Sequence, residues 1–232
     1  MAERNPIIVA LDFAEARPAI EMARQLRPHV GGFKVGLELL TGPGPATVAA
    51  VRELGLPVFV DAKLHDIPNT VHRSARNLGA LGARWVTAHG AGGQAMLQAA
   101  AEGLEQGAAG HPAGILAITV LTSLTGADLA ATGITGSPGR QVARIAKLAR
   151  ATGVEGVVCS VKELGDVAQV APDLLKVTPG IRPTGAATDD QARVSTPSEA
   201  IRRGADWLVI GRSITRSDDP AQAATAIADG IG

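Results

Sequence analysis

The unit from which the chain is built is clearest in the segment Val58-Phe59-Val60-Asp61-Ala62-Lys63-Leu64-His65-Asp66-Ile67-Pro68-Asn69-Thr70-Val71. It opens with a continuous apolar run over Val58–Val60, which is typical of a parallel strand buried on both faces. Charged residues follow at once, and a helical pattern then covers Val71–Leu81. The segment therefore predicts one strand–helix unit with polar residues at the carboxyl end of its strand.

This unit recurs along the chain. The apolar runs that predict strands are Ile7–Leu11, Gly32–Val35, Val58–Val60, Trp85–Ala88, Ile115–Leu121, Gly156–Cys159, Leu174–Val177 and Trp207–Ile210. The segments with helical spacing are Glu15–Leu26, Pro45–Leu54, Val71–Leu81, Gly93–Gln106, Gly139–Ala151, Lys162–Val170, Pro197–Arg203 and Pro220–Ile231. Eight such units in 232 residues predict an α/β fold, a (β/α)₈ TIM barrel that forms a single domain over residues 1–232. A doubly wound open sheet is the alternative, but the sequence has no composition break that marks a second domain.

Composition narrows the classes of function. Hydrophobic residues make up 46% of the chain and charged residues 19%, which predicts a globular protein. Lys plus Arg and Asp plus Glu both number 22, so the net charge is zero, which argues against nucleic-acid and anionic-membrane partners. The single cysteine, Cys159, cannot form an intrachain disulfide, and the N-terminus lacks a signal-peptide pattern. We expect a cytoplasmic protein.

Chemistry is expected at the carboxyl ends of the predicted strands, because barrel enzymes keep their reacting groups there. The residues at these ends are Asp12, Lys34, Asp61 with Lys63, His89, Thr122 with Ser123, Ser160, Thr178-Pro179-Gly180 and Gly211-Arg212. Two long connections, Thr122–Pro138 and Pro179–Thr196, follow the fifth and seventh strands. The second is rich in Gly, Thr and Pro and is a candidate lid.

Four charged residues predict a catalytic cluster. Residues two apart in a strand face the same side, so Asp61 and Lys63 should both point to the barrel mouth, with Asp66 on the loop and Lys34 within reach. Such a cluster can stabilise a developing carbanion and oppose a carboxylate that is to be expelled. The alternative is a structural salt-bridge network, which the position at the active-site end of a barrel disfavours.

A phosphate site is predicted beside it. The loops after strands seven and eight form the usual phosphate cradle of barrels. Gly180 and Gly211 allow close backbone approach, and Arg212 supplies several hydrogen-bond donors. The alternative is a pair of ordinary turn glycines with a solvated arginine.

The run Asp61-Ala62-Lys63-Leu64-His65-Asp66-Ile67-Pro68-Asn69-Thr70 resembles the active-site signature of the orotidine 5′-phosphate decarboxylase family. Further segments resemble the same family, in the same order: Val9–Asp12, Phe33–Gly36, Thr119–Ser123, Val177–Arg182 and Val209–Arg212. The resemblance implies a carboxy-lyase that converts orotidine 5′-monophosphate to UMP in pyrimidine synthesis, with neither a cofactor nor a metal.

The resemblance also implies a role for each catalytic residue. Lys63 would protonate C6 of the pyrimidine as carbon dioxide leaves, and Asp61 would lie against the departing carboxylate. Lys34 and Asp66 would complete the charge network. In a homodimer, Asp66 would reach into the neighbouring subunit's site.

The remaining implied roles concern binding. Ile67 and Thr70 would cross the same dimer interface, and Asp12 would bind ribose hydroxyls together with Lys34. Ser123, with Thr122 beside it, would read the amide edge of the pyrimidine. The residues implied around the phosphate are Arg182, Gln191, Gly211 and Arg212.

Two rival functions remain open. Related barrels that decarboxylate or condense sugar phosphates share an Asp-x-Lys-x-x-Asp core but use a divalent metal, for which Glu38 is the obvious extra ligand here. A catalytically silent, phosphate-binding barrel subunit is the rival from another class.

Other residue types carry weaker signals. His65 next to Asp66 could suggest a metal pair, but no supporting cluster follows. His89 could line the pocket or pack in the structure. Cys159, Trp85 and Trp207 are expected to be core residues.

Overall fold

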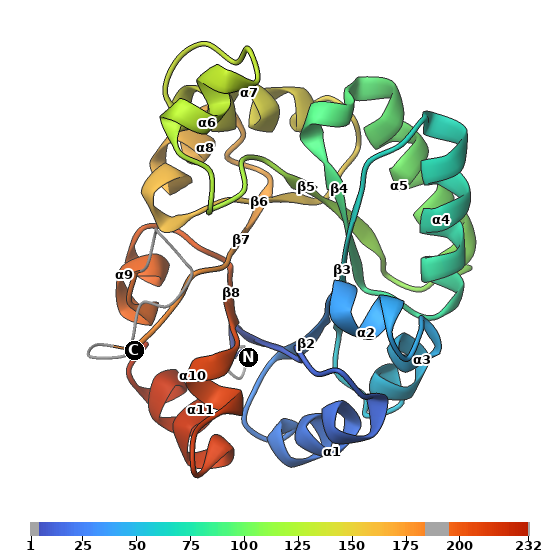
Figure 1. Ribbon diagram of the computed structural model, residues 1–232, viewed down its shortest axis with the longest axis vertical. Coiled ribbons are helices and arrows are strands. Elements are labelled where there is room, and N and C mark those ends of the chain that lie inside the picture. The colour runs from blue at the N-terminus through green and yellow to red at the C-terminus, as the bar shows by residue number, and fades with distance from the viewer. Residues whose placement is uncertain (1–4, 184–194, 232) are drawn as a thin grey trace.

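The computed structural model describes residues 5–183 and 195–231, and in it eight parallel strands close into a barrel in sequence order (Figure 1). The strands are β1 Ile7–Ala10, β2 Gly32–Val35, β3 Val58–Leu64, β4 Trp85–His89, β5 Gly114–Ile118, β6 Gly156–Val158, β7 Leu175–Thr178 and β8 Trp207–Ile210. The pairing of β1 with β8 closes the ring. The predicted (β/α)₈ barrel is confirmed, and an open sheet is excluded.

Helices surround the barrel in Figure 1. The α-helices are α1 Ala16–Leu26, α2 Leu37–Thr41, α3 Ala46–Arg52, α4 Pro68–Ala80, α5 Gln94–Ala108, α6 Gly126–Ala131, α7 Pro138–Arg150, α8 Leu164–Val170, α9 Pro197–Arg202, α10 Arg212–Thr215 and α11 Pro220–Asp229. Two short 3₁₀ helices, η1 Gly90–Gly92 and η2 Val161–Glu163, precede α5 and α8. In the described part of the chain, none of these helices has the length and apolarity that crossing a membrane requires.

All eight predicted helices are present, with ends shifted by up to three residues, and three short ones were missed. The long connection Thr122–Pro138 contains α6, a helix that the sequence analysis did not predict. Thr125 caps this helix and forms a reciprocal capping box with Asp128. That Thr-x-x-Asp pattern is visible in the sequence, whereas α2 and α10 are too short to show helical spacing.

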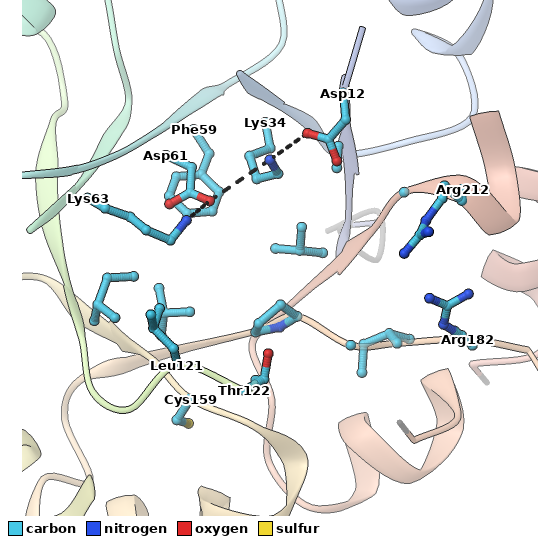
Figure 2. A pocket seen from close by; sticks show the side chains of 18 of the residues that line it. Asp12, Lys34, Phe59, Asp61, Lys63, Leu121, Thr122, Cys159, Arg182 and Arg212 are labelled. Atoms are coloured by element: carbon cyan, nitrogen blue, oxygen red, sulfur yellow. Dashed lines mark hydrogen bonds and ion pairs between the residues drawn. The ribbon is translucent and has the colours of Figure 1, made fainter. Parts of the chain in front are cut away.

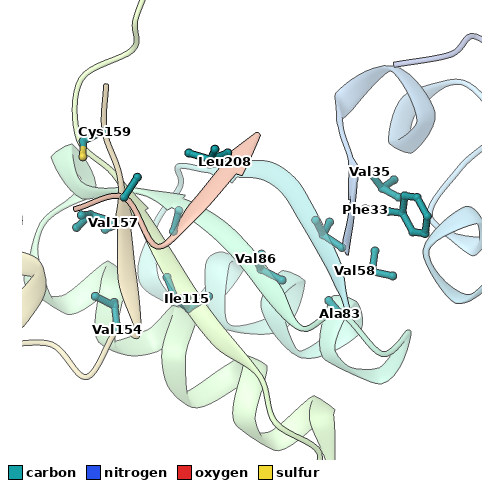
Figure 3. Close-up of a cluster of buried hydrophobic side chains, with 14 of the residues drawn as sticks. Phe33, Val35, Val58, Ala83, Val86, Ile115, Val154, Val157, Cys159 and Leu208 are labelled. Carbon is teal, nitrogen blue, oxygen red and sulfur yellow. The ribbon is translucent and has the colours of Figure 1, made fainter. Parts of the chain in front are cut away.

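The buried side chains form two layers. The layer inside the barrel consists of Ile8, Ala10, Phe59, Trp85, Leu116, Val177, Trp207 and Val209. The layer between strands and helices includes Phe33, Val35, Val86, Ile115, Val157 and Leu208 (Figure 3). Trp85 and Trp207, each the first residue of its strand, meet edge to face with ring centres 5.1 Å apart. Aromatic packing therefore fills the amino-terminal end of the barrel, as predicted for both tryptophans.

Candidate active site

A pocket opens among the carboxyl ends of the strands, and most of the predicted site residues line it (Figure 2). Those that do are Asp12, Lys34, Asp61, Lys63, Thr122, Arg182, Gly211 and Arg212. They come from β1, β2, β3, β5, β7 and β8 or from the residues that directly follow these strands. The barrel thus gathers residues that lie up to 200 positions apart in the chain.

Charges of alternating sign run across one side of this pocket. Lys63 Nζ lies 2.7 Å from Asp61 Oδ2, and Lys34 Nζ lies 3.9 Å from the same oxygen. Lys34 Nζ also contacts Asp12 Oδ1 at 3.0 Å. The side chains of Lys34 and Asp61 are only 11% and 14% exposed, so each charge depends on its neighbours rather than on water. We call this row, Lys63–Asp61–Lys34–Asp12, the charge chain.

Lys34, Asp61 and Lys63 of the predicted cluster lie in the charge chain, but its fourth member is Asp12 and not Asp66. The reason given for the geometry was also wrong. A regular alternation in β3 was expected to align Asp61 with Lys63. Instead, the β3–β4 register shifts, and three residues of β3 stand opposite the single residue Thr87 of β4. Lys63 adopts φ +49°, a left-handed conformation that side chains other than glycine rarely take. A bulge of this kind redirects a side chain next to an active site.

Thr87 was missed by the sequence analysis, where it is one residue of an apolar run. Its hydroxyl accepts a hydrogen bond from the backbone N–H of Lys63 at 2.8 Å and donates one to Asp61 Oδ1 at 3.0 Å. Both oxygens of Asp61 are therefore engaged, one by Thr87 and the other by Lys63.

Four predicted residues lie outside the pocket lining of their own chain. Asp66 is exposed, and its carboxylate accepts a hydrogen bond from the N–H of Ile67 at 2.7 Å. Ile67 is 66% exposed, and Thr70 is exposed as well. Ser123 is exposed beside Thr122.

Two arginines occupy the opposite side of the pocket. Arg182 follows β7 and Arg212 follows β8, and their guanidinium groups lie near each other in Figure 2. Gly180, between β7 and Arg182, has φ +78°, which glycine adopts without strain. The N–H of Arg182 binds the carbonyl of Ser195 at 3.0 Å, which ties the two described ends of this connection together. Gln191 lies outside the described residues.

The lining of the pocket is positive overall. Its described residues include four basic side chains and two acidic ones, Asp12 and Asp61, so its formal charge is 4 − 2 = +2. The whole chain is neutral. Positive charge is thus concentrated locally, which favours an anionic ligand.

Part of the pocket lining is apolar, which the sequence analysis did not anticipate. It consists of Phe59, Ile118, Val120, Leu121, Val158 and Cys159. Cys159 is 1% exposed, and burial raises the pKa of its thiol to about 12, so it stays protonated near neutral pH. The prediction that Cys159 is a core residue is confirmed.

Two histidines stack next to the charge chain. The rings of His65 and His89 are 5.2 Å apart and inclined by 30°. Burial lowers the pKa of His89, and the nearby His65 and Lys63 lower it further, against an opposing effect of Asp61. His89 thus packs against His65 and is not among the described residues that line the pocket.

Within residues 5–183 and 195–231, no three His, Cys, Asp or Glu side chains come together as a possible metal site. Glu38, the candidate ligand of the metal-dependent alternative, is exposed on α2.

Comparison with known proteins agrees with this geometry. Residues 5–227 match the family model described as "Orotidine 5′-phosphate decarboxylase / HUMPS family". A protein of Anaeromyxobacter sp. (strain K) named orotidine 5′-phosphate decarboxylase is 51% identical over 232 residues and 100% of both chains. One of the same name from Dichelobacter nodosus (strain VCS1703A) is 48% identical over 96% of this chain and 97% of its own.

Solved structures give the same result. The crystal structure of orotidine 5′-phosphate decarboxylase from Lactobacillus acidophilus superposes with a TM-score of 0.87 at 36% identity, over 98% of this chain and 99% of that one. An uncharacterized conserved protein from Geobacillus kaustophilus superposes with a TM-score of 0.86, also at 36% identity, over 98% of this chain and 100% of that one. The barrel, its charge chain and these relatives together lead to one conclusion: the chain belongs to the orotidine 5′-phosphate decarboxylase / HUMPS family.

Proposed function

We propose that this chain decarboxylates orotidine 5′-monophosphate to UMP and carbon dioxide, the last step of UMP synthesis. The observation that carries the proposal is the charge chain, in which two partly buried lysines alternate with two carboxylates at the mouth of a barrel of this family. The substrate carries a phosphate and a carboxylate, which suits a pocket of formal charge +2.

Lys63 is the proton donor in this mechanism. The bond between C6 and the carboxylate breaks, its electron pair stays on C6, and carbon dioxide departs. The pyrimidine ring cannot delocalise that pair well, so a nearby positive charge must stabilise it. Lys63 Nζ transfers one proton to C6, which gives UMP. Asp61, 2.7 Å from that nitrogen, holds the ammonium group beside the reacting carbon.

The other end of the nucleotide extends towards the arginines. Asp12 and Lys34, in contact at 3.0 Å, would bind the ribose hydroxyls, and Thr122 with Ser123 would read the pyrimidine edge. Arg182 and Arg212 would hold the phosphate, together with Gly211 and Gln191. Arginine suits this task because its planar fork of donors matches phosphate oxygens. The binding energy of the phosphate can then support chemistry at the distant C6.

The working form in this proposal is a homodimer in the cytoplasm. Asp66 would complete the charge network of the neighbouring subunit, and Ile67 and Thr70 would cross the interface. The exposure of Ile67, 66% in the isolated chain, supports this, because a second subunit would bury it. The neutral net charge gives no reason to expect nucleic-acid or membrane partners.

The test is to incubate the purified chain with orotidine 5′-monophosphate and to identify the products by chromatography and mass spectrometry. We expect UMP and carbon dioxide in equal amounts. Unchanged substrate, with a protein whose circular dichroism shows it to be folded, would contradict the proposal.

A further inference from the structure

We infer that Thr87 is a positioning residue for the decarboxylation, because its one hydroxyl holds both the backbone of Lys63 and the carboxylate of Asp61. The inference rests on the proposed function above. Thr87 lies in the middle of β4 and is fully buried, with no exposed surface. It makes no contact with solvent and is absent from the described lining of the pocket, so it acts through its two neighbours.

A threonine hydroxyl has a single proton to donate, and here its only proton is committed to Asp61. Thr87 Oγ1 donates to Asp61 Oδ1 at 3.0 Å and accepts from the N–H of Lys63 at 2.8 Å. Asp61 Oδ2 in turn accepts from Lys63 Nζ at 2.7 Å. These contacts form a closed ring that fixes Lys63 at its backbone and at its ammonium group.

The backbone of Lys63 requires such support. Among the described residues, two that are not glycine have positive φ, Lys63 and Ala109, both at +49°. Ala109 follows the last residue of α5, where a left-handed residue is a common way to end a helix. Lys63 lies within β3, where that conformation costs energy and persists only if the surroundings hold it. The hydrogen bond to Thr87 is the contact that holds it.

The orientation of β4 explains why Thr87 can hold the backbone of Lys63. Trp85, two residues earlier, points into the barrel with the inner core layer, so Thr87 shares that inward face. It is also the single β4 residue opposite the three-residue bulge of β3. Any side chain here meets the bulge, but an apolar one would leave the Lys63 N–H and Asp61 Oδ1 without their partner.

The test compares Thr87→Val, which keeps the shape and removes the hydroxyl, with Thr87→Ser, which keeps the hydroxyl. We expect Thr87→Val to lower kcat about 100-fold, since small displacements of a reacting group have effects of this order. KM should change little, because Arg182 and Arg212, which follow β7 and β8, are untouched. Thr87→Ser should retain most of kcat, because it keeps the hydroxyl. If Thr87 acted only through packing of its methyl group, Thr87→Ser would lose activity and Thr87→Val would not.

The matched control is Thr152→Val. Thr152 is also buried, and its hydroxyl makes one hydrogen bond, to the carbonyl of Ala149 at 2.7 Å, at the end of α7 and away from the pocket. It should lose thermal stability with kcat unchanged. If Thr87→Val does not fold, Thr87→Ala is measured instead, with the same expectation.

The outcomes separate the two proposals. Turnover by the unmodified protein, with kcat lost in Thr87→Val and restored in Thr87→Ser, supports the inference. Turnover with kcat unchanged in Thr87→Val overturns the inference alone. A folded, unmodified protein without turnover overturns the proposed function, and this inference with it.

Discussion

The two ends of the pocket differ in how their charges are arranged. At the reacting end, Lys63, Asp61, Lys34 and Asp12 alternate in sign and contact one another at 2.7 to 3.9 Å. At the other end, Arg182 and Arg212 bring two groups of the same sign near each other. Alternation fixes side chains before a substrate arrives, which suits stabilisation of a transition state. Two like charges suit a doubly charged anion such as a phosphate group. In the proposed function, chemistry therefore belongs to the end with Lys63, and phosphate binding belongs to the end with the two arginines.

The largest expected effect is that of Lys63→Ala. It removes the proposed proton donor, together with its positive charge, so kcat of the folded variant should fall at least about 1,000-fold. Lys147→Ala, on the exposed side of α7, is the control and should keep full activity. A near-normal kcat for Lys63→Ala would break the assignment of chemistry to the charge chain.

Ile67→Asp tests whether the two ends of the pocket differ in their need for a second subunit. In the proposed function, the partner subunit contributes to the reacting end only. A charge placed in an apolar interface costs several kcal/mol, so the dimer dissociation constant should rise at least about 100-fold. Sedimentation should show monomers, and kcat should fall at low protein concentration. The same charge introduced by Gln169→Asp, on α8 across the barrel, should change neither. A dimer that survives Ile67→Asp with normal kcat would contradict the proposed interface.

Arg212→Ala tests the binding end. Loss of a charged hydrogen bond costs about 1.5–3 kcal/mol, so KM should rise roughly 10- to 100-fold while turnover at saturation persists. Arg24→Ala, an exposed arginine in the last turn of α1, serves as the control. An unchanged KM with a reduced kcat would reverse the roles of the two ends.

The smallest effect concerns the pH dependence of stability. The pKa of His89 is lowered in the folded protein by burial and by the nearby His65 and Lys63. Below about pH 6.5, the unfolded chain therefore binds more protons at this residue than the folded protein does. The free energy of unfolding decreases as the pH falls through that range. His89→Gln should weaken the fall in Tm between pH 7.5 and 5.5. If Tm of the variant and of the unmodified protein changes with pH in the same way, burial of neutral His89 does not contribute to the pH dependence of stability.

The sequence predicted the barrel and most of the pocket because both follow from simple regularities. Apolar runs identify the strands, and the residues that follow them must meet at one end of a barrel. The bulge at Lys63 was not predicted, because strand periodicity assumes a regular register. The contacts of Thr87 were not predicted either, because Thr87 and Asp61 are 26 positions apart in the sequence. Asp66 and Ile67 are exposed in their own chain, so the roles proposed for them require a second subunit, which no single-chain pattern contains.

The most direct test of the account is the turnover of orotidine 5′-monophosphate, followed by ultraviolet absorbance, in buffer containing EDTA. Asp61 is already engaged by Lys63 and Thr87, and the lysines supply the positive charge. We therefore expect rapid loss of substrate with UMP as product, at a rate that added magnesium does not change. Turnover that is absent in EDTA and restored by magnesium would contradict the account and favour a metal-dependent mechanism.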